Sequence, residues 1–183
     1  MTSYGTVGKG LWLIFIGQIL GILSIFPVMV LISAVLLLVG LYIAGKGEVR
    51  LRPAFVCGIA ELLVAVLSAW TPSLILTVAV TVLDVLIVYY ICSVTSDLLD
   101  ALGKRDMAKW GRVVWKIYLL GIVAMNMISL AVVTSRVVFW SMMELIVAIN
   151  LGIRFVIGMI LLLHLYHVYS TFEEQERSNG GAS

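Results

Sequence analysis

The stretch Glu144–Tyr169, ELIVAINLGIRFVIGMILLLHLYHVY, decides the fold of this chain because it is almost wholly apolar. A helix of about 20 apolar residues is long enough to cross the hydrocarbon core of a membrane. Arg154 nevertheless lies near the middle of this run. A central arginine costs roughly 3 kcal/mol on insertion, whereas each leucine or isoleucine contributes about −0.5 kcal/mol. So costly a residue indicates partners elsewhere in the chain.

The composition of the whole chain is that of a membrane protein. Of its 183 residues, 62% are hydrophobic and 12% are charged, and the mean hydropathy is +1.15. Soluble globular domains are about 45–50% apolar and about 25% charged. The apolar runs are continuous rather than alternating, which disfavours a β-barrel. We therefore expect an all-α integral membrane protein in which residues 1–183 form a single transmembrane domain.

Prolines divide the apolar sequence into six predicted spans. The run Leu11–Ala44 carries no charge, and as one helix it would be about 51 Å long, too long for a hydrocarbon core of about 30 Å. Pro27 provides the break, because proline disfavours helix at the preceding residue and suits a helix start. Pro53 and Pro72 begin further helices in the same way. The predicted spans are residues 8–25, 27–45, 53–70, 72–94, 113–134 and 144–170, arranged as three tight helical hairpins, with 171–183 as a flexible cytoplasmic tail.

The basic residues predict the orientation in the membrane. Ten of the twelve Lys and Arg residues fall on one side of the six-span arrangement: Lys9, Lys46, Arg50, Arg52, Lys104, Arg105, Lys109, Arg112, Lys116 and Arg177. Only Arg136 falls on the other side, and Arg154 lies within a span. Basic loops stay in the cytoplasm. We therefore expect a multi-pass protein of the plasma (inner) membrane with both termini in the cytoplasm.

Polar side chains recur at one depth in the predicted spans. At 1.5 Å per residue, Glu61 lies about 12 Å from the inner end of its span, and Asp84 and Arg154 each lie about 15 Å from an end. All three thus fall near the midplane of a core about 30 Å thick. Amide side chains at similar depth are Gln18, Asn126 and Asn150. The sequence predicts that these six residues form a polar core and a ligand or ion site.

The charges of this polar core do not balance. Arg154 supplies one positive charge, and Glu61 with Asp84 supplies two negative charges. A carboxylate left unpaired among apolar helices would take up a proton or hold a cation. Ionisable residues inside a membrane are by default functional. We therefore expect one acid to pair with Arg154 and the other to serve as a proton, cation or amine site.

The sequence favours two functions, ahead of a membrane enzyme as the third. The first is a small protein that binds or translocates a solute or ion through the polar core of Glu61, Asp84 and Arg154. The second is an accessory or assembly subunit of a membrane complex, in which these charges are a structural network. The expected partners are the lipid bilayer and either another membrane protein or a second copy of the chain. The net charge of +2 gives no basis for nucleic-acid binding.

The sequence predicts no cofactor, and no metal or catalytic residue. Cys57, Cys92, His164 and His167 are soft-metal ligand types, but they come from three different spans without local cysteine spacing. Free cysteine commonly behaves as a small buried hydrophobe, so packing is the favoured interpretation. The catalytic and phosphate-binding sequence motifs are missing, so a membrane enzyme is an open interpretation that no motif supports.

Overall fold

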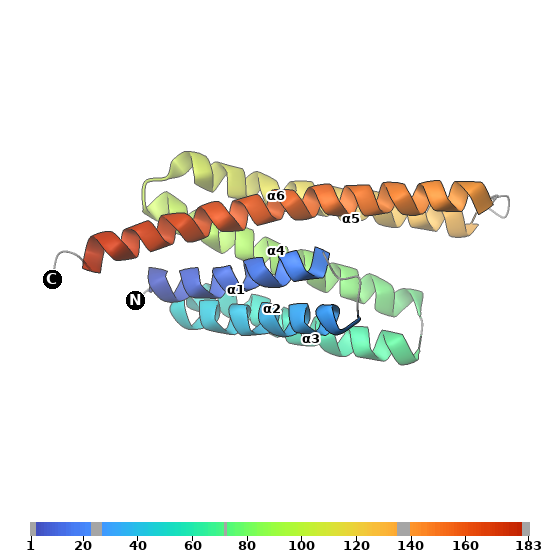
Figure 1. Cartoon of the computed structure of the whole chain (residues 1–183), viewed down its shortest axis with the longest axis horizontal. Coiled ribbons are helices and arrows are strands. Elements are labelled where there is room, and N and C mark those ends of the chain that lie inside the picture. Colours follow the sequence, from blue (N-terminus) through green and yellow to red (C-terminus); the bar gives the residue numbers. More distant parts are fainter. Residues whose placement is uncertain (1–2, 23–26, 72, 135–139, 181–183) are drawn as a thin grey trace.

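The computed structural model of the protein describes residues 3–22, 27–71, 73–134 and 140–180. In these ranges six helices are long and apolar enough to cross a membrane, so the prediction of an all-helical chain with six such helices is confirmed. The elements are α1 (Tyr4–Ile22), α2 (Pro27–Gly47), the short 3-10 helix η1 (Val49–Leu51), α3 (Arg52–Trp70), α4 (Leu74–Ala101), α5 (Arg105–Thr134) and α6 (Trp140–Gly180) (Figure 1). The predicted break just before Pro27, together with Pro72 and Arg136, lies outside the described residues.

Several helices continue beyond the apolar runs that predict them. The fourth helix extends past residue 94 to Ala101, and the fifth begins at Arg105. Between them Gly103 has a φ of 77°, a backbone conformation that glycine adopts without steric cost. The sixth helix is 41 residues long, so residues 171–180, expected to belong to a flexible tail, are helical. Polar residues thus extend these helices beyond their apolar runs.

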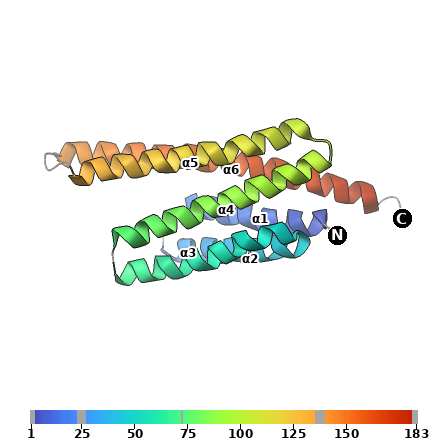
Figure 2. The same ribbon diagram turned by 180° about the vertical axis from the view of Figure 1, so that it is seen from behind.

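The six long helices form a ring in the order of the chain. Each helix packs against the next, and α6 returns to pack against α1 (Figures 1 and 2). Aromatic side chains line this last seam: the ring of Trp12 stacks on that of Tyr169 at 4.9 Å, and Tyr4 meets Phe172 edge-on at 5.4 Å. The first helix begins and the last ends at the same end of the bundle, which we call the terminal end. We call the opposite end the distal end.

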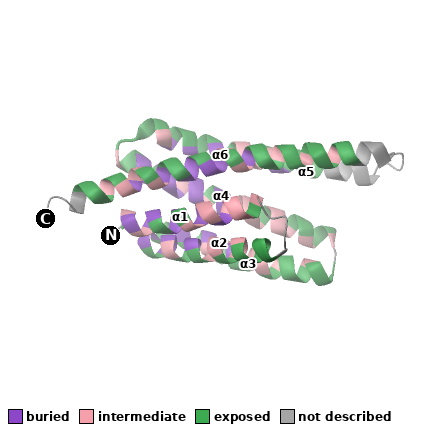
Figure 3. Cartoon of the chain, in the orientation of Figure 1, coloured by how far each residue is buried: buried purple, intermediate pink, exposed green. Residues whose placement is uncertain are grey.

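Buried residues gather in the terminal half of the bundle (Figure 3). The main core holds apolar side chains from all six long helices, and Leu11, Leu41, Leu99, Leu165 and Phe172 are fully buried in it. Towards the distal end, the residues whose burial is described are mostly exposed or only partly buried. A second, smaller cluster of Ile122, Met125 and Ile157 lies between α5 and α6. The bundle is therefore tightly packed at one end and loosely packed at the other.

Glycines bring α1 and α2 into backbone contact in the packed half. A Cβ added at Gly10 would lie 2.5 Å from the backbone nitrogen of Ala44, and one added at Gly40 would lie 2.7 Å from the carbonyl oxygen of Gly10. Small residues of this kind permit close approach of helices in membranes. The same two helices also share a hydrogen bond, which Ser33 Oγ donates to the carbonyl oxygen of Gly17 at 2.8 Å.

Replacing Gly10 by alanine is expected to destabilise the protein by about 1–3 kcal/mol, because the added methyl group would overlap backbone atoms that cannot move aside. Gly152→Ala is the matched control, since a Cβ there meets no atom within 4 Å, and it should be neutral or stabilise by up to about 1 kcal/mol. The free energy of unfolding of the purified protein in mixed micelles measures both. Equal effects of the two substitutions would contradict the close α1–α2 contact.

Candidate functional site

Five of the six predicted site residues line one cavity. This cavity has a volume of about 530 Å³ and is bounded by α3, α4, α5 and α6. Its polar lining residues are Glu61, Thr77, Thr81, Asp84, Asn126, Asn150 and Arg154. Arg154, Asn126 and Thr77 are exposed, so the cavity is continuous with the surface. The folded chain therefore gathers the polar residues around a space rather than packing them against one another.

A second cavity of about 560 Å³ adjoins the first. The two share Asp84, Ile122, Leu151 and Arg154 in their linings. Gln18 on α1, the sixth predicted residue, lines only this second cavity. Arg154 and Asp84 thus stand at the boundary between two connected spaces, and Gln18 lies on the opposite side of that boundary from Glu61.

The carboxylate of Asp84 is held in place by a tyrosine. The hydroxyl of Tyr118 on α5 donates a hydrogen bond to Asp84 Oδ2 at 2.5 Å, a length typical of a hydroxyl that donates to a carboxylate. This contact joins α4 to α5 beside both cavities. The predicted direct pairing of one acid with Arg154 is not found: within the described ranges, no carboxylate lies within 4.0 Å of the Arg154 guanidinium.

Apolar side chains close the polar region on its terminal side. Val88 and Ile91 on α4, Val114 on α5 and Leu161 on α6 are buried, with at most 2% of their surface exposed. Val88 and Ile91 lie between Asp84 and Thr95 on α4. Val114 lies on the terminal side of Tyr118 on α5, and Leu161 lies between Arg154 and His164 on α6. At about 1.5 Å per residue, Asp84 and Thr95 are about 16 Å apart along α4. The cavities therefore end on a packed apolar layer.

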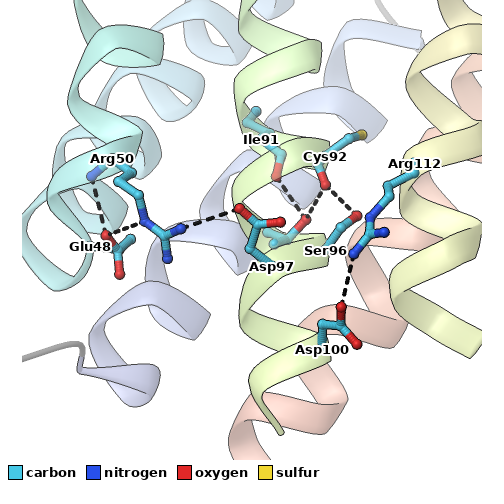
Figure 4. A network of polar contacts seen from close by, with 9 residues as sticks. Glu48, Arg50, Ile91, Cys92, Ser96, Asp97, Asp100 and Arg112 are labelled. Carbon is cyan, nitrogen blue, oxygen red and sulfur yellow. Dashed lines mark hydrogen bonds and ion pairs between the residues drawn. The ribbon is translucent and has the colours of Figure 1, made fainter. Parts of the chain in front are cut away.

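On the terminal side of this layer, ion pairs join η1, α4 and α5 (Figure 4). Arg50, the middle residue of η1, bridges Glu48 at 3.0 Å and Asp97 on α4 at 3.2 Å. Arg112 on α5 bridges Asp100 on α4 at 3.0 Å. Their side chains, Glu48 apart, are about half exposed, so each pair contributes no more than about 1 kcal/mol. Their combined effect is to hold the terminal ends of η1, α4 and α5 together.

His164 is buried in the terminal half, apart from the cavities. Its Nε2 lies 3.4 Å from Thr95 Oγ1, and only 1% of the residue is exposed. Thr95 already donates its hydroxyl proton to the carbonyl oxygen of Ile91 at 2.7 Å, so Nε2–H of His164 is the donor to Thr95. His167, three residues on, is exposed, and its Nδ1 contacts the carbonyl oxygen of Leu163. The two histidines thus face different surroundings.

The described residues contain no group of three or more His, Cys, Asp or Glu side chains able to hold a metal ion. Cys92 is buried and Cys57 is half-buried, and both are free thiols. The two cysteines and two histidines that the sequence places in three spans therefore do not converge on one site within the described ranges.

Sequence reasoning missed Tyr118, Thr77 and Thr81 as parts of the site. Counting residues along the helices places the Cα of Tyr118 closer to the terminal end than that of Asp84. Such a count ignores the length of the tyrosine side chain, which reaches Asp84. Thr77 and Thr81 are spaced four residues apart and precede Asp84, so all three lie on the face of α4 that lines the cavity. That spacing was the available signal, because hydroxyl side chains on the same face as a buried acid extend its polar surface.

Removing the Tyr118 hydroxyl is expected to cost about 1–3 kcal/mol of stability, because Tyr118→Phe leaves the Asp84 carboxylate short of a donor. Tyr89→Phe is the control: its ring packs against Trp115 and Tyr90, and no hydrogen bond involves its hydroxyl in the described structure. In the double variant Tyr118→Phe/Asp84→Asn the loss should be smaller than the sum of the single losses. Additive losses in this unfolding experiment would show that the two groups do not interact.

Comparison of the chain with protein-family models, with curated proteins and with solved structures found no match. The proposal of a function therefore rests on the chemistry of the cavity itself.

Proposed function

We propose that the protein is a polytopic membrane protein that binds and translocates a small solute or ion through the cavity lined by Glu61, Asp84 and Arg154. One observation carries this proposal. The two acids and the arginine line a common cavity, and none of the three takes part in an ion pair within the described ranges. Charged groups inside a membrane that face a cavity mark solute or ion pathways.

The proposed setting is the plasma (inner) membrane, with the terminal end of the bundle in the cytoplasm. Ten basic residues predicted to lie on one side support this orientation through the positive-inside rule. We further propose that the six helices are organised as three hairpins joined by minimal turns on the outer side. The cavity then opens towards the outer half of the membrane, and the apolar layer with its ion pairs closes the cytoplasmic half.

This arrangement fits one state of a carrier. A carrier holds its site near the middle of the membrane and exposes it to one side at a time. The packed layer of Val88, Ile91, Val114 and Leu161 is the closed side in this proposal. The weak, half-exposed ion pairs at the terminal end are of a kind that a conformational change could break and re-form at small cost.

The alternative is an accessory or assembly subunit of a membrane complex whose buried charges only hold the helices together. A structural network needs charges that are paired and hydrogen-bonded to one another, since an unpaired charge in an apolar medium is costly. Asp84 has Tyr118 as a partner, but Arg154 and Glu61 form no ion pair within the described ranges. The observed geometry therefore favours a binding site.

A cysteine at Leu151 is expected to react with a charged, membrane-impermeant thiol reagent added from the outer side. The background is the chain with both native thiols removed by Cys57→Ala and Cys92→Ala. Leu151 lines both cavities and is 70% exposed. Val156→Cys is the matched control on the same helix: Val156 is 56% exposed but lines neither cavity, so it should face lipid and stay unlabelled. Equal labelling of the two positions would contradict a water-filled cavity.

Loss of either unpaired charge is expected to reduce transport by about tenfold or more, because a hydrogen bond to a charged group is worth about 1.5–3 kcal/mol. The variants are Arg154→Gln and Glu61→Gln, and the measurement is uptake of a panel of amino acids, amines and inorganic cations into proteoliposomes. Arg105→Gln and Glu144→Gln carry the same changes at exposed positions outside the cavities and should transport normally. If the cavity variants matched these controls, the proposed function would be lost.

A further inference from the structure

The lining of the first cavity is rich in hydrogen-bond acceptors. Thr81 donates its hydroxyl proton to the carbonyl oxygen of Thr77 at 3.0 Å, and Thr77 donates its own to that of Ser73 at 3.1 Å. A hydroxyl has one proton to donate and two lone pairs to accept with. Because both protons are used within α4, the two oxygens can offer the cavity only lone pairs.

Asn150 adds a buried acceptor with no protein partner. Its Oδ1 is enclosed and accepts no hydrogen bond from the described residues, although the residue lines the cavity. A buried polar atom left without a partner costs about 1–3 kcal/mol. The site is therefore completed by a group that brings an N–H or O–H donor to this oxygen.

The carboxylates of Glu61 and Asp84 also need hydrogen-bond donors, and they carry negative charge as well. Glu61 on α3 forms no ion pair within the described ranges, and it lines the same cavity as Asp84. Asp84 receives one hydrogen bond, from Tyr118, whereas a carboxylate can accept about four. A group with several N–H donors and a positive charge satisfies both acids and the neutral acceptors beside them.

Arg154 lines the same cavity and requires an anionic hydrogen-bond acceptor. Its guanidinium carries five N–H donors and a permanent positive charge, and its planar fork matches a carboxylate. The cavity volume of about 530 Å³ lies within the range of about 300–1,000 Å³ that holds small organic ligands. That volume is far more than a bare metal cation fills. The ligand is therefore expected to be organic and to carry an anionic group as well as a cationic one.

We propose that the cavity binds a small zwitterion, an organic ammonium whose other end carries a carboxylate. The ammonium lies among Glu61, Asp84 and the oxygens of Asn150 and Thr81, and the carboxylate lies on Arg154. This proposal rests on the proposed function and names its substrate class. The bound ligand leaves the formal charge of the site unchanged, because its own charges cancel.

Calorimetric titration of the purified protein in lipid nanodiscs tests the proposal with matched probes. The probes are ω-amino acids of two to six carbons, the alkylammonium and the carboxylate of each length, and sodium chloride. At least one ω-amino acid should bind about tenfold or more tightly than the alkylammonium of the same length. The matching carboxylate should bind more weakly than the ammonium, and sodium should not displace the amino acid. A carboxylate that binds as tightly as the amino acid, or displacement by sodium alone, would overturn the proposal.

Four variants assign the two ends of the ligand. Glu61→Gln should weaken binding of both amino acid and ammonium about tenfold, whereas Glu144→Gln, an exposed glutamate outside the cavities, should leave both unchanged. Arg154→Gln should abolish the advantage of the amino acid over the ammonium. Thr81→Val, which keeps the side-chain shape, should weaken the ammonium several-fold and remains informative if a charge variant fails to fold. If neither Thr81→Val nor Glu61→Gln changed the affinity for the ammonium, the proposed ammonium site would be wrong.

The outcomes separate this inference from the proposed function. If Leu151→Cys reacts from the outer side and Arg154→Gln stops uptake of some solute, the function stands even when no zwitterion binds. If a zwitterion binds but no solute crosses the membrane, the site stands and the transport proposal fails.

Discussion

A guanidinium and two carboxylates inside an apolar bundle have to recover the hydration that they lose. Moving an ion out of water costs several kcal/mol even after the protein relaxes, so their surroundings determine what the bundle can be. Tyr118 meets part of this need at Asp84. The remaining need is met by a cavity that reaches the surface beside Arg154. Helix packing is incomplete around these three residues, and this incompleteness follows from their charge.

The two halves of the bundle are built from different kinds of contact. In the terminal half, glycines let α1 and α2 touch along their backbones, and aromatic rings join α1 to α6. In the distal half such contacts give way to threonine, asparagine and charged side chains around open space. Stability comes mainly from the first half, because the close van der Waals packing that holds apolar helices together in a membrane is concentrated there. Changes in the cavity therefore need not endanger the fold.

Composition and proline placement were sufficient to predict six long apolar helices, because the length of a membrane span is set by the bilayer. Depth counting also predicted that Glu61, Asp84, Asn126, Asn150 and Arg154 would come together, and they line one cavity. It could not predict that Gln18 would face the neighbouring cavity, because rotation of a helix about its axis depends on tertiary packing. Because helix rotation cannot be derived from the sequence, the Tyr118–Asp84 contact was not predicted either. The expected ion pair with Arg154 failed because sequence gives charge balance but not distance.

The length of α6 has a mechanical consequence. It is a single helix of 41 residues, and the same element carries Arg154 at the cavity, His164 in the packed half and Arg177 beyond it. A continuous helix joins these three positions rigidly, and α6 is most deeply buried around His164 and Phe172. In the proposed function, a rotation of α6 about this packed region would displace Arg154 at the cavity and the exposed Arg177 together.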